Sequence, residues 1–213
     1  LAAAAGAGLL AFALLRGGQA HRLLVLLSAP ALHALWYAQW AVLLLAAALL
    51  PALLPLTLVK PHIGLPIALT RLTRRRALAC ATFGLATLLI LPDWPLRWLG
   101  QIGGFSGYVP LLTVPGALLA LALLRWRDPD ARYLLLCAAV PQRALYDAPI
   151  LAAALRSRAE VLAWTLATWL YWPLLALLGA APPWPARLIV LCAYLPLLAL
   201  LLRRPAMQPR GRP

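Results

Sequence analysis

Acidic residues are scarce in this chain of 213 residues, where five Asp and Glu stand against 19 Lys and Arg. Charged residues of all kinds amount to 11%, whereas soluble domains carry about 25%. Hydrophobic residues amount to 64%, and the mean hydropathy is +0.87. A water-soluble fold of this length could not bury so much apolar surface, so the composition excludes one.

Motifs for several common chemistries are also absent. The chain has no Walker A loop, no dinucleotide-binding glycine pattern, no HExxH motif and no Gly-x-Ser-x-Gly elbow. Its three cysteines, Cys80, Cys137 and Cys192, lie inside apolar runs and lack metal or redox spacing. ATP-driven transport and metalloprotease activity therefore have no support, and we expect no metal ion, no cofactor and no disulfide.

The sequence does contain long apolar runs separated by arginine clusters. This pattern predicts an all-α fold, a polytopic transmembrane helical bundle whose arginine-rich loops lie on the cytoplasmic side. Glu160 is expected to pair with nearby arginines at that edge. A net charge of +14 would suggest nucleic acid in a soluble protein. Because the arginines stand between apolar runs, we instead expect membrane lipids as partners and no nucleic acid.

The chain divides into a transmembrane helical domain, 1–202, and a basic, proline-rich tail, 203–213, which we expect to be disordered and cytoplasmic. Single spans are predicted at 77–91, 109–124, 161–179 and 188–202. The apolar stretch 23–58 is too long for one span and predicts two or three short or broken helices. The first apolar run lacks a basic start and a cleavage site, so we expect an N-terminally truncated fragment.

The segment 133–155 has the length of one span, but Pro141-Gln142-Arg143 and Tyr146-Asp147 interrupt its middle. A single crossing would place the arginines that follow it outside, against the positive-inside rule. We therefore prefer a re-entrant hairpin, with Tyr146-Asp147 deep or toward the outer face. Such broken backbone is tolerated where protein or a wet cavity lines it.

Polar side chains at membrane depth are costly, which makes them candidates for a functional site. Lys60, the only lysine, is followed by Pro61 and His62. Its ammonium could hold a phosphate, and His62 could add a hydrogen bond or a proton. On spacing alone, a snorkelling lysine at a helix end is an equally good interpretation.

Asp147 is the most unusual acid, because a carboxylate in an apolar hairpin needs a partner or a proton. Arg143 lies one helical turn away and can pair with it. One interpretation is a structural Arg–Asp pair; the other makes Asp147, beside Tyr146, a site acid or an acceptor for substrate hydroxyls. Gln39, on an aromatic-flanked turn, either binds a sugar or phosphate oxygen or tethers two helices.

The order of these motifs resembles a known family. The motifs are Ser28-Ala29-Pro30, Gln39, Val59-Lys60-Pro61, Arg74-Arg75-Arg76, Pro92-Asp93-Trp94-Pro95 with Trp98, and Tyr146-Asp147 after Pro141. The collinear series is similar to multi-spanning GT-C-type glycosyltransferases, in particular bacterial polyprenol-phosphate-mannose-dependent α-mannosyltransferases. The chain departs from the family at Ala38, where glycine is usual, and in a short stretch between Gln39 and Lys60.

The resemblance implies broken or re-entrant helices in the bacterial cytoplasmic (inner) membrane. It implies transfer of a sugar, mannose, from a polyprenyl-phosphate donor to an envelope glycolipid or glycan at the extracytoplasmic face. The donor-phosphate candidates are Lys60, His62 and Arg143, and the sugar or acceptor candidates are Gln39, Tyr146 and Asp147. No residue matches the family's catalytic carboxylate, so we expect that base upstream of Leu1 and no activity from this chain alone.

Two other functions stay open at the level of sequence. A small transporter or flippase for a lipid or metabolite needs the same broken helices, although it also predicts a repeat symmetry that the sequence lacks. A non-catalytic subunit of a membrane complex predicts buried polar groups that pair with one another. A cavity at the outer face that gathers Gln39, Lys60, His62 and Tyr146-Asp147 would favour the transferase.

Overall fold

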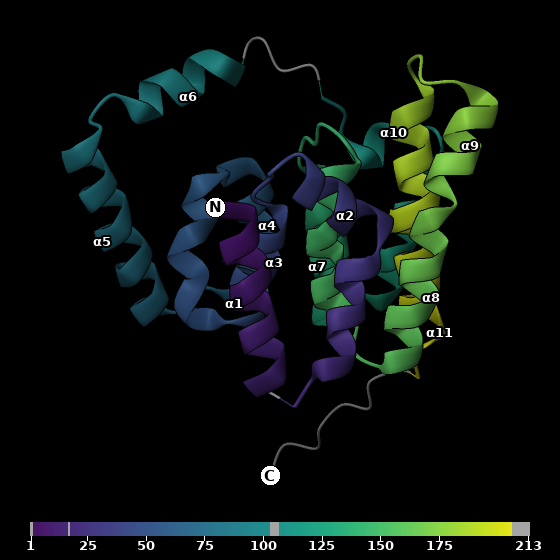
Figure 1. Cartoon of the computed structure of the whole chain (residues 1–213), viewed down its shortest axis with the longest axis horizontal. Coiled ribbons are helices and arrows are strands. Elements are labelled where there is room, and N and C mark those ends of the chain that lie inside the picture. Colours follow the sequence, from purple (N-terminus) through teal and green to yellow (C-terminus); the bar gives the residue numbers. More distant parts are fainter. Residues whose placement is uncertain (1, 17, 103–106, 206–213) are drawn as a thin grey trace.

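A computed structural model of the chain describes residues 2–16, 18–102 and 107–205 (Figure 1). Within those ranges every regular element is a helix, and the only strand-type pairing is an isolated antiparallel bridge between Tyr108 and Gln142. The all-α prediction is therefore confirmed for this part of the chain.

The elements fall into two halves of the chain. In the first half they are α1 (Ala2–Arg16), η1 (Ala20–Leu27), α2 (Ala29–Trp36), α3 (Ala41–Leu49), η2 (Pro51–Val59), α4 (Pro61–Arg71), α5 (Arg74–Ile90) and α6 (Trp94–Ile102). In the second they are η3 (Pro110–Leu112), η4 (Pro115–Arg125), α7 (Pro129–Ala139), η5 (Leu145–Ala154), α8 (Arg158–Trp169), α9 (Tyr171–Leu178), α10 (Trp184–Ile189), η6 (Val190–Tyr194) and α11 (Leu195–Arg203). Elements labelled η are 3₁₀-helices, except η6, which is a π-helix.

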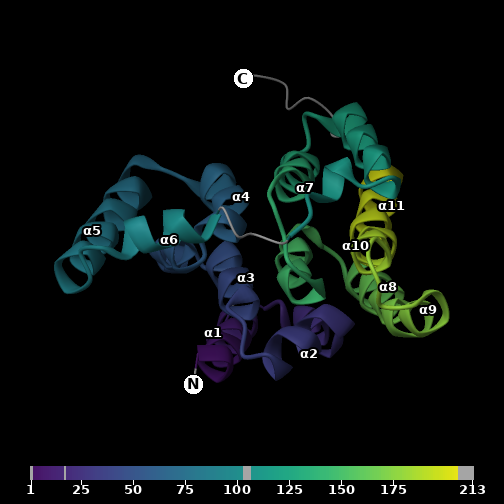
Figure 2. The same ribbon diagram turned by 90° about the horizontal axis from the view of Figure 1, so that it is seen from above.

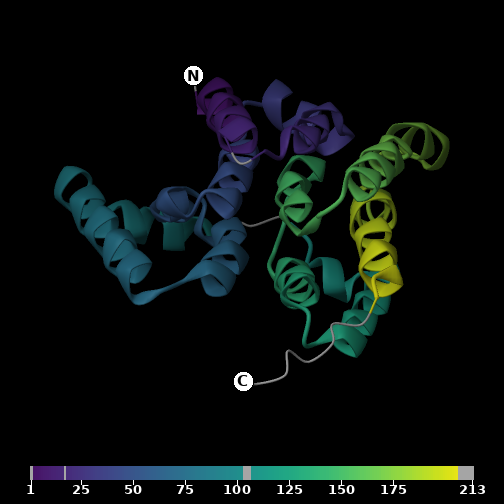
Figure 3. The ribbon, with the colours of Figure 1, turned by 90° about the horizontal axis from the view of Figure 1, so that it is seen from below.

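The two halves meet at η5. Seen from above and from below, α5 lies at one edge of the molecule and α9 at the opposite edge (Figure 2, Figure 3). Between them, η5 packs against α2 and α3 of the first half and against α7 of the second. All of η5 is buried except Tyr146, which is half-buried. This helix therefore forms the centre of the core.

Membrane-crossing capacity is concentrated in a few helices. Among the residues that the structure describes, two stretches are long and apolar enough to span a membrane, as judged by length and composition: Arg158–Leu178, which comprises α8 and α9, and Trp184–Arg203, which comprises α10, η6 and α11. A third is added if α5 and α6, which meet at 96°, form one broken span. These helices correspond to three of the four predicted single spans.

The fourth predicted span, 109–124, is not one α-helix. It is divided into η3 and η4, which begin at Pro110 and Pro115. Proline lacks the N–H that an α-helix interior needs, so it interrupts the continuous ladder. A 3₁₀-helix rises about 2.0 Å per residue, so the 11 residues of η4 still reach about 22 Å. The expectation of short, broken helices in 23–58 holds, since α2, α3 and η2 divide that stretch.

The segment 133–155 turns back on itself. Nε of Arg156, just after the segment, lies 2.6 Å from Oδ2 of Asp130, just before it. A second contact joins Nη2 of Arg156 to Oδ1 of Asp128 at 3.0 Å. Because its two ends touch, the segment cannot run from one side of the molecule to the other, and the hairpin, α7 and η5, is the geometry found.

Arginines from distant parts of the chain gather at one end of the molecule, which we call the arginine end: Arg22, Arg71, Arg125, Arg156 and Arg204. Nη2 of Arg125 donates to the carbonyl of Leu202 at 2.7 Å. Burial lowers the pKa of Arg22, the nearby charges of Arg71 and Arg156 also lower it, and those of Asp130 and Glu160 oppose the shift. Loops that were predicted to share one side of a membrane therefore lie together.

The start of the predicted tail belongs to the fold, which corrects the boundary at 203. Arg203 is the last residue of α11, and Nε of Arg204 lies 2.7 Å from Oε1 of Glu160. The expected pairing of Glu160 with an arginine is thus confirmed. The remainder of the predicted tail, 206–213, lies outside the described residues.

Candidate functional site

The polar side chains singled out from the sequence meet around one cavity of about 530 Å³. Its wall comes from the α2–α3 turn, the η2–α4 junction, the α7–η5 turn and α6. The lining residues are Gln39, Trp40, Val59, Lys60, Pro61, His62, Trp98, Gln101, Pro141, Arg143 and Tyr146. Five of the six predicted site residues therefore line the same cavity, and the sixth, Asp147, is fully buried next to it.

The cavity lies at the far end of these elements from the arginine end. α4 runs from His62 at the cavity to Arg71, and the hairpin of α7 and η5 turns at Arg143 and returns to Arg156. α5 likewise begins in an arginine cluster and leads to α6, which contributes to the cavity wall. The arginine end and the candidate site thus lie at opposite ends of these elements.

Lys60 stands at the apex of a helical hairpin, between η2 and α4. Pro61 at the first position of α4 suits a helix start, because its fixed φ is helical and its missing N–H has no partner there anyway. The two arms touch closely: a Cβ on Gly64 would lie 2.2 Å from the carbonyl oxygen of Thr57, so glycine is required. This packing holds Lys60 in place with its side chain only 12% exposed.

The ammonium of Lys60 forms an ion pair with Oδ1 of the buried Asp147. Oδ2 of Asp147 accepts a hydrogen bond from the backbone N–H of Arg143 at 2.9 Å. The prediction that a helical turn separates Arg143 from Asp147 is wrong, because 141–144 is not helical and η5 begins only at Leu145. The acid therefore takes a lysine 87 positions away as its ionic partner.

This arrangement gives Asp147 the role of a counter-ion. A buried carboxylate must be paired or hydrogen-bonded, and each oxygen of Asp147 has such a contact. Asp147 is not among the residues that line the cavity, whereas Lys60 is. The sequence left open a structural Arg–Asp pair and a site acid. The ion pair found joins Asp147 to Lys60 instead, and Lys60 is the member of that pair that lines the cavity.

His62 enters the cavity as a neutral hydrogen-bonding group. Burial lowers the pKa of His62, and the nearby Lys60 charge lowers it further, while Asp147 opposes the shift. The imidazole is therefore uncharged near neutral pH, with one nitrogen able to donate and the other to accept. An anion in the cavity would favour its protonated form.

Gln39 lies on the tight turn between α2 and α3. Its Nε2 donates to the carbonyl of Tyr37 at 3.2 Å, which orients the amide at the cavity wall. Ala38 adopts a φ of 50°, in the left-handed region that costs an L-residue roughly 1–2 kcal/mol.

An aromatic wall adjoins the charged pair. Nζ of Lys60 lies 5.2 Å from the ring centroid of Tyr146, a cation–π distance. The same ring lies 5.7 Å from His33 and 6.3 Å from Tyr37, and His33 packs edge-on against Trp172 at 5.3 Å. Tyr146 thus links η5 to α2, and His33 of α2 in turn contacts Trp172 of α9.

Six lining residues were not assigned to the site from the sequence: Trp40, Val59, Pro61, Trp98, Gln101 and Pro141. Trp98 and Gln101 are three positions apart on α6, a spacing that puts them on one helical face. That spacing was the available signal, but nothing in the sequence indicated that α6 would lie against the Lys60 hairpin.

Hydrogen bonds to the neighbouring Gln142 hold the turn that carries Arg143 in place. Tyr108 and Gln142 exchange two backbone hydrogen bonds of 2.8 Å, and Gln142 Nε2 donates to the carbonyl of Cys137 at 3.1 Å. Gln142 also hydrogen-bonds to the hydroxyl of Tyr194, which comes from the π-helical turn η6. Such turns re-aim side chains within a helix and are frequent at functional sites. The last span therefore supports the site.

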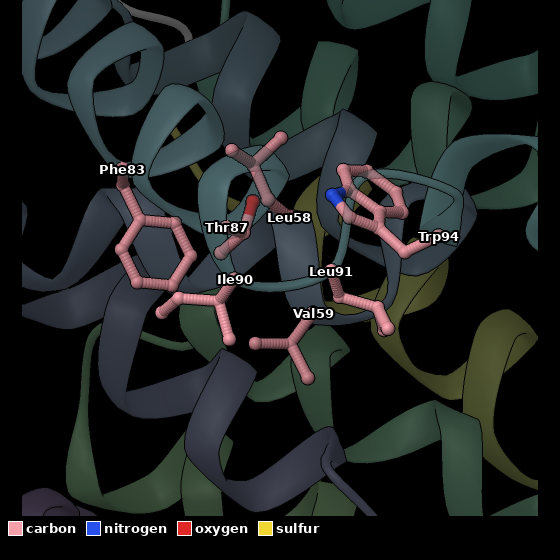
Figure 4. Close-up of a pocket in the computed structure, with 7 residues that line it drawn as sticks. All are labelled: Leu58, Val59, Phe83, Thr87, Ile90, Leu91 and Trp94. Atoms are coloured by element: carbon pink, nitrogen blue, oxygen red, sulfur yellow. The ribbon is translucent and has the colours of Figure 1, made fainter.

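An apolar cavity of about 320 Å³ adjoins the polar one. Figure 4 shows its side chains, which come from η2, α5 and the start of α6. They are Leu58, Val59, Phe83, Thr87, Ile90, Leu91 and Trp94. Val59 is in the lining of both cavities, so the two lie next to each other at that residue.

These features define a cationic, partly aromatic pocket next to an apolar cavity, inside a helical membrane-type fold. Lys60 and Arg143 bring positive charge to the wall, while the acid Asp147 lies fully buried next to it. The described part of the chain holds no group of three or more His, Cys, Asp or Glu that could bind a metal ion. No protein-family model, curated protein or solved structure matches the chain.

Proposed function

We propose that this chain is the donor-binding membrane domain of a glycosyltransferase that uses a polyprenyl-phosphate sugar. The sugar is mannose and the acceptor an envelope glycolipid or glycan. By the positive-inside rule the arginine end faces the cytoplasm, so the polar cavity opens toward the opposite face of a bacterial inner membrane. The GT-C-like arrangement of the fold belongs to this proposal.

The observation that carries the proposal is that a polar and an apolar cavity share Val59 in their walls. A polyprenyl phosphate has an anionic head and a long apolar tail, and the polar and apolar cavities offer one environment for each. Lys60 and Arg143 supply cationic donors for the phosphate, and His62 supplies a further hydrogen bond. A phosphate leaving the sugar would be stabilised by the same groups.

The uncharged side chains suit the sugar and the acceptor. Gln39 and Gln101 carry amides that bind hydroxyl groups, and Trp98 offers an indole face for a sugar ring. Asp147 is the counter-ion that fixes Lys60. The base that removes the acceptor proton is not assigned to any residue of this chain.

A direct test measures binding of farnesyl phosphate to the protein in detergent, with farnesol and inorganic phosphate as the two separate parts. We expect farnesyl phosphate to bind more tightly than either part, because only it fills both cavities. Arg143→Gln should weaken it about tenfold, the effect of losing one charged hydrogen bond. Thr87→Trp should fill the apolar cavity and reduce the advantage over inorganic phosphate.

The matched control is Arg97→Gln. Arg97 carries the same charge and lies on α6, but it is exposed and paired with Asp93 at 2.6 Å. This variant should bind as the parent chain does. Equal weakening by Arg97→Gln and Arg143→Gln would mean diffuse charge attraction and would contradict the proposal.

The transporter alternative is separated by a second measurement. A flippase would move a fluorescent polyprenyl phosphate between the leaflets of a liposome that contains the protein. The donor-binding role predicts tight binding without such movement. Movement of the lipid between leaflets that depends on Lys60 and Arg143 would contradict the transferase proposal and favour a flippase.

A further inference from the structure

The turn between α2 and α3 is held in one conformation by backbone hydrogen bonds. The N–H of Gln39 donates to the carbonyl of Ala34 at 2.7 Å. The N–H of Ala38 donates to that of Leu35 at 3.1 Å. Together the two bonds form a Schellman motif, and Ala38 occupies its left-handed position although it carries a side chain. Backbone strain of this kind persists where the surroundings enforce it, and it is concentrated at ligand-binding sites.

Aromatic rings extend from this turn to the polar cavity. The ring of Tyr37 lies 6.3 Å from that of Tyr146, and Nζ of Lys60 lies 5.2 Å from the Tyr146 ring. Tyr146 lines the cavity, whereas Tyr37 is 57% exposed. Tyr37 also packs edge-on against His33 at 4.8 Å, and His33 packs in the same way against Trp172. A continuous aromatic surface therefore leads from the cation of the cavity to the outside of the molecule.

An amide accompanies these rings. Nε2 of Gln39 donates one hydrogen to the carbonyl of Tyr37. Its second hydrogen and its Oε1 have no hydrogen-bond partner among the described residues, and the side chain lines the cavity. The adjacent Trp40 also lines the cavity and is partly exposed. Flat aromatic faces beside an amide suit a sugar, which presents apolar C–H faces and a rim of hydroxyl groups.

The turn and the apolar cavity are separated by two helices. α2 packs against α3, α3 against η2, and η2 against α5, which forms one wall of the apolar cavity. Seen from above, α3 correspondingly lies between α2 and α5 (Figure 2). A prenyl chain in the apolar cavity would therefore leave the turn between α2 and α3 accessible to a second substrate.

We propose that this turn is the acceptor site, and that it binds a glycan of several sugar units across Tyr37, Gln39 and Trp40. The inference rests on the proposed transferase function. The unit that receives the new sugar lies in the polar cavity beside Tyr146, and the next units stack on the exposed rings of Tyr37 and Trp40. Because these rings extend beyond the cavity, the site favours a saccharide chain over a single sugar or a lipid alcohol.

The test measures the affinity of mannotetraose and of mannose for the protein in detergent by isothermal titration calorimetry. Mannotetraose should bind at least about tenfold more tightly, because several of its units contact the protein. Tyr37→Ala should weaken mannotetraose binding about tenfold through the loss of one aromatic contact. Tyr37→Phe keeps the ring and should restore most of that affinity.

The matched control is Trp126→Ala. Trp126 is 60% exposed but follows Arg125 at the arginine end, so its loss should leave mannotetraose binding unchanged. Gln39→Ala removes no ring and should weaken binding about fivefold through one lost hydrogen bond. This second variant keeps the inference testable if Tyr37→Ala does not fold.

Three results would overturn the acceptor site. Equal affinities for mannose and mannotetraose would exclude an extended site. A loss in Tyr37→Phe as large as that in Tyr37→Ala would exclude stacking on the ring. Unchanged binding in Tyr37→Ala and Gln39→Ala would assign the exposed rings to the membrane interface, where aromatic side chains also gather.

Farnesyl phosphate, titrated into the same protein, separates this inference from the function on which it rests. Binding of farnesyl phosphate without binding of mannotetraose would overturn the acceptor site and leave the donor-binding role standing. Binding of mannotetraose alone would overturn the transferase proposal, and with it the assignment of the turn as an acceptor site.

Discussion

The two ends of the molecule handle charge in opposite ways. At the arginine end, each carboxylate accepts several hydrogen bonds. Arg156 and Arg204 donate to three acids, which are Asp128, Asp130 and Glu160. At the cavity end, one buried acid, Asp147, meets one lysine, and the other polar groups line an open space. Shared contacts make the arginine end tolerant of single losses, whereas the cavity end depends on one pair.

This difference assigns different roles to the two ends. Interlocked ion pairs fix the starts of α7 and α8 and the end of α11, so they serve the architecture. Polar groups in the wall of a cavity lie where a ligand can reach them, which is a condition for binding. Variants at the two ends should therefore separate stability from binding.

The largest effect is expected from Lys60→Ala. This change leaves Asp147 as a buried charge without its cation, and breaking a buried pair from one side costs about 3–5 kcal/mol. Chemical unfolding in detergent measures the loss. The double variant Lys60→Ala with Asp147→Ala should recover most of it, and if it is as unstable as the single variant, the pair is not what the cavity end depends on.

The next effect distinguishes two arginines of the shared network. The side chain of Arg204 is 10% exposed and bonds to Asp130, Glu160 and the carbonyl of Ala154, so Arg204→Ala should cost about 2–3 kcal/mol. Arg156 is 47% exposed, and Arg156→Ala should cost about 1 kcal/mol or less. Equal losses in the same unfolding assay would contradict this ranking.

Two buried tyrosines test whether the last span supports the cavity. Tyr194 reaches the cavity turn through Gln142, whereas the Tyr133 hydroxyl donates to the carbonyl of Ile150 at 2.9 Å, away from the site. Removal of either hydroxyl should cost about 1 kcal/mol. Only Tyr194→Phe should also weaken farnesyl phosphate binding, because it loosens the turn that carries Arg143. Equal binding by both variants would limit Tyr194 to a role in stability.

The smallest effect is a pH dependence from His62. Because its pKa is lowered in the folded chain, the unfolded chain binds more protons between the folded value and the ordinary value of 6.5. Stability should therefore be lost as the pH falls from 6.5 through the folded value. Thermal unfolding of the parent chain and of His62→Gln shows whether the slope belongs to this residue. A bound phosphate should reduce this pH dependence of stability, because an anion favours the protonated imidazole of His62.

Much of the architecture followed from the sequence. Apolar runs between arginine clusters predicted a helical membrane-type fold, and arginines on both sides of 133–155 predicted its hairpin. The polar residues that were unusual at membrane depth, Lys60 and Asp147 above all, do gather at one place. The usable signal was the free-energy cost of burying a polar side chain, because that cost can be recognised for each residue from its own sequence context.

What could not be predicted were relations between distant segments. The partner of Asp147 is 87 positions away, and local helical spacing pointed to Arg143 instead. The π-helical turn at Tyr194 and the approach of α6 to the cavity depend on packing between elements. No local pattern carries that information, because the periodicity of a helix does not state which neighbour its face will meet.

The most direct test of the central claim is an experimental structure of the protein in lipid nanodiscs with farnesyl phosphate. We expect the phosphate between Lys60 and Arg143, with the prenyl chain running past Val59 into the apolar cavity beside Ile90. A phosphate found at the arginine end, with the cavity around Lys60 filled only by solvent, would contradict it.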